Sequence, residues 1–292
     1  MKILSEEKIL NHLRKLSLRT GLTVNDLRVV LALERAIARI EADSNLAEHL
    51  IFKGGFLLFK SIDTTRYTRD ADALAQGITP QAVIRLVKQA LENDIHDCLW
   101  FGDIQVFPLP NQGPYGGLQF SIAFHITSSP PNKRQIKKLS RIHIDISFGE
   151  LILFPKKKEN MPSLIPELES VSWLVYPLES VFAEKLETLI RRGSANSRAK
   201  DIYDLIILFE RCKNMNKLIE AITLTFSNRN MALPISFVAS ISNFDMNILE
   251  RAWNSVIIVG PKKIFSEIRS ELIRCLKKLD GLPAWPNYKR NS

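Results

Sequence analysis

Two aspartates separated by a single residue, Asp70 and Asp72, are the side chains of this sequence best suited to chemistry. In an extended segment, residues two positions apart point to the same face, so both carboxylates can bind one metal ion or a pair of ions. A third acid, Asp145, lies in a later segment of alternating polarity. Converging carboxylates cannot all stay ionised without a nearby cation. The pattern predicts a site for a divalent metal and a phosphate-bearing substrate.

A glycine pair, Gly54 and Gly55, precedes these acids and follows an apolar segment. Glycines at a strand-to-helix turn let backbone amides approach phosphate oxygens, and the positive end of the following helix adds to the attraction. Lys60 lies about one and a half helical turns further on, where it faces either the same pocket or solvent. The alternative is a tight turn that only needs small residues, followed by a solvated turn in which the aspartates pair with Arg66 and Arg69.

Three further groups carry charge next to apolar positions. In the segment 141–148, His143 and Asp145 share one face with Ser147, and that face lines either a cleft or the solvent side of a strand. We expect His143 to order a neighbour, since magnesium prefers carboxylate oxygens. Lys185 can reach a triphosphate, and Asp201 can position that lysine or the attacking hydroxyl. The alternative for the latter two is an ion pair on a helix surface.

The composition is that of a globular protein with a basic surface. Of 292 residues, 46% are hydrophobic and 24% are charged, so the chain can bury a substantial core. No apolar stretch approaches the roughly 18 residues that a membrane helix requires, and the first residues lack a signal-peptide core, so we expect no membrane partner and a cytoplasmic location. The three cysteines lack the spacing of zinc sites. A formal charge of +9 favours RNA, DNA or nucleotides as partners.

The hydrophobic pattern predicts an α+β fold with two domains. Turn-rich segments separate three expected strands, so a mixed or antiparallel sheet is favoured over a doubly wound one. We place this sheet, with N-terminal helices, in residues 1–175 and an α-helical bundle in residues 176–292. The expected helices are 6–18, 27–40, one after the glycine pair, one from Pro80, 178–192, 199–212, 217–226, 246–256 and 261–279; the strands are 50–52, 104–109, 118–126 and 141–148, with basic turns at 133–138 and 156–158.

Taken in order, several short motifs resemble those of the AbiEii/AbiGii toxin family of nucleotidyltransferases. The resemblance spans roughly residues 30 to 210, and the order and spacing of the motifs are more specific than any one of them. The motifs are Lys53-Gly54-Gly55, Asp70-x-Asp72, Asp145, Ala183-Glu184-Lys185-Leu186 and Lys200-Asp201-Ile202-Tyr203-Asp204.

This resemblance implies a nucleotidyltransferase domain of the DNA polymerase β-like type joined to a helical bundle. It implies transfer of a nucleoside monophosphate from an NTP, dependent on Mg²⁺ (or Mn²⁺), to a hydroxyl acceptor, with RNA such as tRNA expected. It also implies a growth-inhibiting role in a toxin–antitoxin or phage-defence system, with a cognate antitoxin. Carried over by residue, Gly54 and Gly55 hold the triphosphate, Asp70 and Asp72 the metals, Lys185 the phosphates, Asp201 assists catalysis and Asp145 is the third acid.

The sequence departs from the family pattern at two positions. Phe56 stands where a small hydroxyl residue is common, which leaves the phosphate contact to backbone amides. Lys200 stands where an arginine usually precedes the aspartate, so the forked geometry is lost but the charge is kept. Two other hypotheses stay open: a catalytically silent nucleotide- or RNA-binding module, and a transferase that modifies a protein hydroxyl from the same donor site.

Overall fold

The computed structural model describes residues 4–62, 64–109, 116–127, 129–149, 156–242 and 244–282. Its contacts divide the chain into two compact units. Unit 1 contains the described residues up to 149 together with 156–175, and unit 2 contains the described residues from 176 onward. Each unit has its own core and is described by itself.

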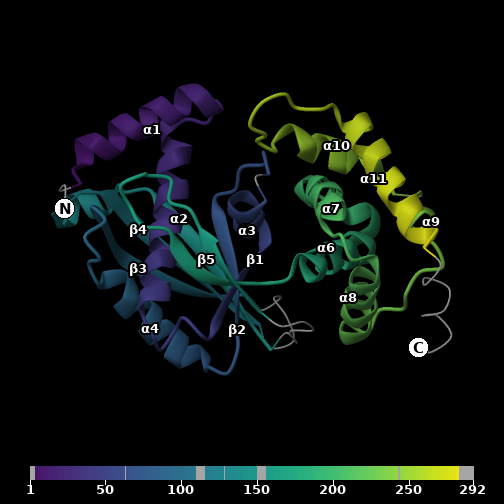
Figure 1. The fold of residues 1–292 in the computed structure, drawn as a ribbon, viewed down its shortest axis with the longest axis horizontal. Coiled ribbons are helices and arrows are strands. Elements are labelled where there is room, and N and C mark those ends of the chain that lie inside the picture. The colour runs from purple at the N-terminus through teal and green to yellow at the C-terminus, as the bar shows by residue number, and fades with distance from the viewer. Residues whose placement is uncertain are drawn as a thin grey trace. The chain divides into compact units, whose positions relative to one another are not determined.

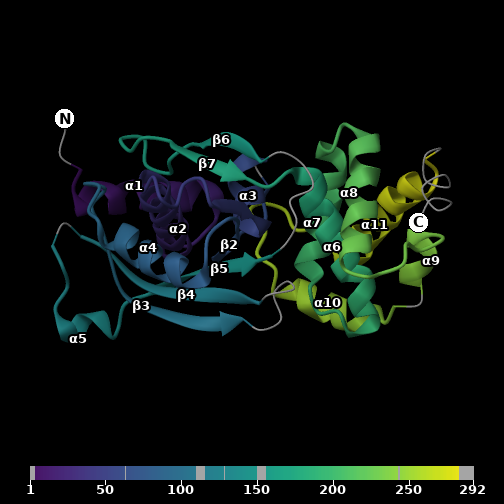
Figure 2. The same cartoon turned by 90° about the horizontal axis from the view of Figure 1, so that it is seen from below.

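Unit 1 is built on a seven-stranded mixed sheet with the order β3-β4-β5-β2-β1-β7-β6. The pairs β3–β4, β4–β5, β2–β1 and β7–β6 are antiparallel, while β2 runs parallel to β5 and β1 parallel to β7. Figure 2 shows β3 at one edge of the sheet and β6 at the other. The expected α+β fold with a mixed sheet is confirmed. The strands are β1 (Leu50–Lys53), β2 (Asp70–Ala75), β3 (Leu99–Leu109), β4 (Gly117–Ile126), β5 (Arg141–Phe148), β6 (Lys157–Met161) and β7 (Val171–Val175).

The helices of unit 1 begin where capping residues predict. Thr23 and Asp26 form a reciprocal capping box at the start of the second helix, and Thr79 caps the helix that begins with Pro80. The second helix packs against three strands of the sheet and is buried along most of its length (Figure 1). The helices are α1 (Glu6–Thr20), α2 (Val24–Ala42), α3 (Gly54–Ser61), α4 (Pro80–Glu92) and α5 (Lys133–Ile136).

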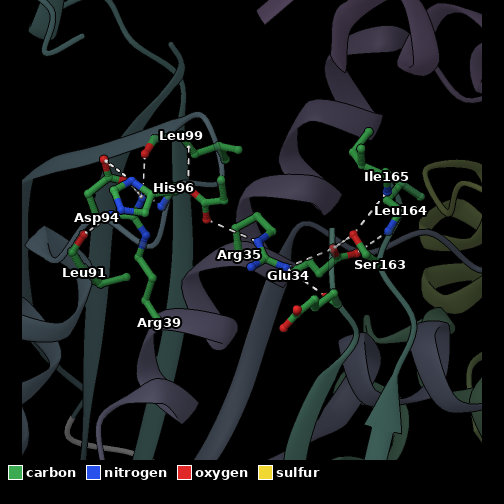
Figure 3. A network of polar contacts seen from close by, with 12 residues as sticks. Glu34, Arg35, Arg39, Leu91, Asp94, His96, Leu99, Ser163, Leu164 and Ile165 are labelled. Carbon is green, nitrogen blue, oxygen red and sulfur yellow. Dashed lines mark hydrogen bonds and ion pairs between the residues drawn. The ribbon is translucent and has the colours of Figure 1, made fainter. Parts of the chain in front are cut away.

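Helix α2 carries three buried charged residues, Glu34, Arg35 and Arg39, that have oppositely charged partners within unit 1 (Figure 3). Arg35 and Arg39 both bind the carboxylate of Asp97, at 3.2 and 2.9 Å. Glu34, which is fully buried, accepts hydrogen bonds from the ammonium of Lys60 and from the hydroxyl of Ser163. A buried charge without its partner is expensive, so these pairs hold α2, α3 and the segment after β6 in one arrangement.

Unit 2 is a group of helices, as expected for the C-terminal part of the chain. Helix α6 packs against α7 and α8, and α11 packs against α7 and α9. The apolar faces of these helices form the core, for which Phe182, Phe226 and Leu276 are representative. The helices are α6 (Leu178–Arg192), α7 (Ala199–Arg211), α8 (Met215–Asn228), α9 (Phe237–Ser242), α10 (Met246–Asn254) and α11 (Phe265–Asp280), with a short 3₁₀ turn, η1 (Gly193–Ala195).

Two strands differ from the sequence expectation. The expected basic turn at 156–158 is wrong from Lys157 onward, because β6 starts there and pairs antiparallel with β7. Its lysines sit on an exposed edge strand, where charged residues are common, so the polar pattern resembles a turn. Strand β3 begins at Leu99, five residues earlier than expected, and a register shift between Gly102 and Gln105 interrupts its alternation. None of the described helices has the length and apolar run needed to cross a membrane.

Candidate active site

The two predicted acids of the Asp-x-Asp motif lie side by side on β2, near the middle of the sheet. Ala71 between them is buried, whereas Asp70 and Asp72 are both partly exposed, so both carboxylates are on the same face of the strand. Across the parallel pair with β5, Asp72 lies opposite Asp145 and Asp70 lies opposite His143. The structure therefore places the three acids on one face of two adjacent strands.

Asp145 is oriented by Gln119, a residue that no sequence pattern singles out. Gln119 on β4 lies opposite it in the antiparallel register, and its amide donates a hydrogen bond of 2.9 Å to Oδ1 of Asp145. No sequence signal points to Gln119, because the contact depends on strand register. The expected role of His143 in ordering a neighbour finds no hydrogen-bond support at Nδ1, which is buried without a partner in the described part of the chain.

The donors present suit a hard divalent cation, since they are carboxylate oxygens. Within the described ranges, however, no group of three or more His, Cys, Asp or Glu side chains is placed closely enough to hold a metal ion. What the sheet provides is two adjacent pairs, Asp70 with Asp72 along β2 and Asp72 with Asp145 across the strands. Asp72 belongs to both pairs and is the centre of the arrangement.

The glycine turn between β1 and α3 is in direct contact with this central acid. Gly54 has a φ of +73°, and a Cβ there would lie 2.0 Å from Oδ2 of Asp72. A Cβ on Gly55 would lie 2.5 Å from the guanidinium of Arg66, a buried residue. The glycine pair is thus needed for close approach, and the neighbours that it admits are a carboxylate and an arginine.

The first backbone amides of helix α3 lie at this turn. Its N-cap, Lys53, places no side-chain hydrogen bond on the first amides of the helix. Those amides and the positive end of the helix dipole face the end of β1, next to the strand that carries Asp72. Backbone amides at the start of a helix are a phosphate-binding type of group, and this is the role that we propose below for Gly54 and Gly55.

Two basic residues that the sequence placed near the acids have other partners. The ammonium of Lys60 lies 2.8 Å from Glu34 and donates to the carbonyl of Pro162, so its side chain is neither solvated nor directed at the start of α3. Arg69 pairs with Asp26 at 2.9 Å. Lys60 is therefore not part of the proposed site.

Unit 2 contains the second predicted group, which is a compact ion cluster between α6 and α7. The ammonium of Lys185 lies 2.7 Å from Asp201 and 2.9 Å from Asp204, and Arg198 lies 2.6 Å from Asp201. Both aspartates are buried and Lys185 is slightly exposed. Burial acts to raise the pKa of Asp201, but the attraction of Lys185 and Arg198 outweighs it and holds that pKa well below its usual range.

The ion pair that the sequence offered as the alternative for Lys185 is present, but it is buried between two helices and is not on a helix surface. Asp201 and Asp204 hold the ammonium, and Arg198 completes the cluster.

Comparison with known proteins agrees with the motif order. Residues 35–278 match the family described as nucleotidyl transferase AbiEii toxin, type IV TA system. A search of curated proteins found no significant match.

Two solved structures have a similar fold. MenT4, a nucleotidyltransferase toxin from Mycobacterium tuberculosis H37Rv, superposes with a TM-score of 0.62 at 17% identity, covering 98% of this chain and 92% of that one. A putative nucleotidyltransferase from H. pylori gives a TM-score of 0.54 at 14% identity, covering 93% and 99%. The match to the family profile extends over most of the chain and includes both the strand acids and the lysine cluster, so this protein belongs to the AbiEii nucleotidyltransferase toxin family of type IV toxin–antitoxin systems.

Proposed function

We propose that this toxin transfers a nucleoside monophosphate from an NTP to a hydroxyl group of RNA, such as tRNA, in a reaction that depends on Mg²⁺ or Mn²⁺. Membership of the family implies an NTP substrate and an antitoxin partner. The observation that carries the proposal is the contact of Asp72 with Gly54, because it puts a metal-binding type of side chain directly beside a phosphate-binding type of turn.

The residues of unit 1 would bind the metal ion, the triphosphate and the side of the site from which the hydroxyl attacks. Asp70 and Asp72 would hold the divalent cation, which supplies neutralisation of charge on the triphosphate and on the departing pyrophosphate. The amides of Gly54 and Gly55 would orient the triphosphate at the start of α3. Asp145, held by Gln119, would complete the acidic face toward the attacking hydroxyl.

Unit 2 supplies the second part of the proposal. Lys185 would bind phosphate oxygens through its ammonium, and Asp201 and Asp204 would hold that ammonium in place. The loss of either acid would leave the remaining partners of a buried cluster uncompensated, so Asp201 serves both structure and activity.

RNA is the proposed acceptor because the chain is basic and because RNA carries free hydroxyls. The formal charge of +9 favours a polyanionic substrate over a neutral one. Binding through phosphates would weaken as the salt concentration rises, with a slope that reports the number of contacts.

The direct test is incubation of the purified protein with magnesium, each α-labelled NTP in turn and total tRNA, with RNA and protein products separated on one denaturing gel. We expect label on RNA that is lost in the Asp70→Asn, Asp72→Asn double variant and in the presence of EDTA. Glu92→Gln, an exposed acid at the end of α4, is the matched control and should keep full activity.

The same gel distinguishes the two alternatives. Label on a protein band would replace the RNA acceptor by a protein hydroxyl. Undiminished transfer by the double variant would contradict the assigned role of the β2 acids. Nucleotide or RNA binding without any transfer would assign the chain to a binding function instead.

A further inference from the structure

An exposed aromatic side chain lies in the same cross-strand row as the acids. The registers of three strand pairs align Phe107 on β3 with Gln119 on β4, Asp145 on β5 and Asp72 on β2. We call these four residues the acid row. Phe107 is 46% exposed, and few other large apolar side chains of the described residues are exposed to this extent.

The members of the acid row share one face of the sheet. Directly opposite residues on neighbouring strands project to the same side, and the hydrogen bond from Gln119 to Asp145 confirms this for the middle of the row. Val106, one position before Phe107, lies opposite fully buried Phe120 and so faces the other side. Phe107 therefore projects on the side of the catalytic acids.

The order of the strands assigns Phe107 to one side of the reaction. The glycine turn follows β1, which lies on one side of β2, whereas β5, β4 and β3 lie in that order on the other side. In phosphoryl transfer the attacking and leaving oxygens are in line, on opposite sides of the phosphorus. With the triphosphate at the glycine turn, the acceptor approaches over β5, β4 and β3.

The spacing of strands sets the reach of this surface. Neighbouring strands are about 4.8 Å apart, so Phe107 lies roughly 10 Å from Asp145 and roughly 14 Å from Asp72. A strand of RNA whose terminal hydroxyl is at the acids would extend its preceding nucleotides across Gln119 to β3. Aromatic side chains bind unpaired bases by stacking, with little preference for sequence.

We propose that Phe107 is an acceptor-binding residue that stacks on an unpaired base of the RNA, upstream of the nucleotide that receives the transfer. The inference rests on the proposed function for the identity of the acceptor. It assigns the β3 edge of the acid row to single-stranded RNA, and it predicts that the acceptor end must be unpaired for several nucleotides.

The test measures binding and transfer separately. A fluorescein-labelled single-stranded RNA, with no NTP present, is titrated with wild-type protein, Phe107→Ala, Phe107→Trp and Leu18→Ala, and bound RNA is followed by anisotropy. Leu18 on α1 is 90% exposed and controls for the loss of an exposed apolar side chain. We expect Phe107→Ala to raise the Kd about tenfold, Phe107→Trp to restore it, and Leu18→Ala to leave it unchanged.

An abasic scan of the RNA locates the stacked base. Removing that base should weaken binding to the wild-type protein by the same factor, with no further loss in Phe107→Ala, because the two changes remove one interaction. In transfer assays Phe107→Ala should raise the KM for RNA while kcat and the KM for NTP stay constant.

Each outcome separates the inference from the proposed function. Transfer to RNA with an unchanged Kd and KM in Phe107→Ala would overturn the inference alone. Binding that depends on Phe107, without transfer by any variant, would support the inference and contradict the transfer. A wild-type protein that binds no RNA would overturn it.

Discussion

Replacement of Gly54 by alanine tests the contact between the glycine turn and the central acid. The added Cβ would meet three atoms of Asp72 at 2.0, 2.7 and 3.0 Å, so the carboxylate has to move. The positive φ of Gly54 adds a backbone cost of about 1–2 kcal/mol for any L-residue. Forcing extra volume into a packed position typically costs about 1–3 kcal/mol more. We expect Gly54→Ala to lower the free energy of unfolding by about 2–5 kcal/mol.

Gly21 provides a matched control for the backbone contribution. Its φ is +74°, nearly the same as that of Gly54, but nothing lies within 4 Å of the Cβ that alanine would add. Gly21→Ala should therefore cost only about 1–2 kcal/mol, and it should leave transfer activity unchanged. Urea unfolding of both variants measures the difference, which is the cost of displacing Asp72.

A double-variant cycle with Asp72→Ala identifies the source of that difference. Alanine at 72 removes the two closest atoms and leaves only the Cβ contact of 3.0 Å. The extra cost of Gly54→Ala should then largely disappear. Transfer activity in Gly54→Ala should fall by about 100-fold, as expected for a catalytic group displaced by an ångström. The reasoning is refuted if Gly54→Ala costs no more than Gly21→Ala, or if the cost is independent of Asp72.

Three other predictions concern buried charges. Glu34→Ala should destabilise unit 1 by about 3–5 kcal/mol, because the ammonium of Lys60 is left buried and unpaired; the loss should shrink in a Glu34→Ala, Lys60→Met double variant, as measured by urea unfolding. Asp201→Asn should destabilise unit 2 at neutral pH, with a difference from wild type that is constant above about pH 5 and shrinks as pH falls below the unfolded value of 3.8. The stabilisation from a lowered pKa is complete only where the group is ionised in both states, and it is lost as the pH approaches the folded pKa. Burial raises the pKa of Glu41 to about 8, so the ionisation of Glu41 opposes folding increasingly between pH 4.5 and 8. Glu41→Gln should therefore raise the Tm at pH 8 and leave it unchanged near pH 4. An equal gain in Tm at both pH values would contradict this assignment.

The sequence was sufficient for the elements with strong local signals. Pro80 identified the start of α4 correctly, because proline is favoured at the first position of a helix. Helix α2 begins at Val24, three residues before the expected start at 27. The alternation in 141–148 identified β5 with the bounds that the structure shows. The strands β6 and β7 were missed, since β6 is a polar edge strand whose pairing with β7 has no local signature.

The candidate site was only partly predictable for the same reason. The acids on β2 were recognised by type and spacing, but the sequence could not show that Asp72 fills the space left by Gly54, which requires the β1–β2 register. Gln119 and the acid row depend on registers across four strands. Lys60 was misjudged because its partner, Glu34, is 26 residues away in sequence and belongs to another helix.

The ion pair of Glu34 with Lys60 has a genetic consequence. It fixes the last turn of α3, the helix that begins at the glycine turn. The carboxylate of Glu34 also accepts a hydrogen bond from the backbone amide of Leu164. Because expression of a toxin selects for survivors that have lost its activity, suppressor mutations should arise wherever this helix can be released. A collection of survivors should therefore contain changes at Glu34 and its partners, far in sequence from the acids. These alleles should lose toxicity only at raised temperature, whereas alleles at Asp70 and Asp72 should lose it at every temperature.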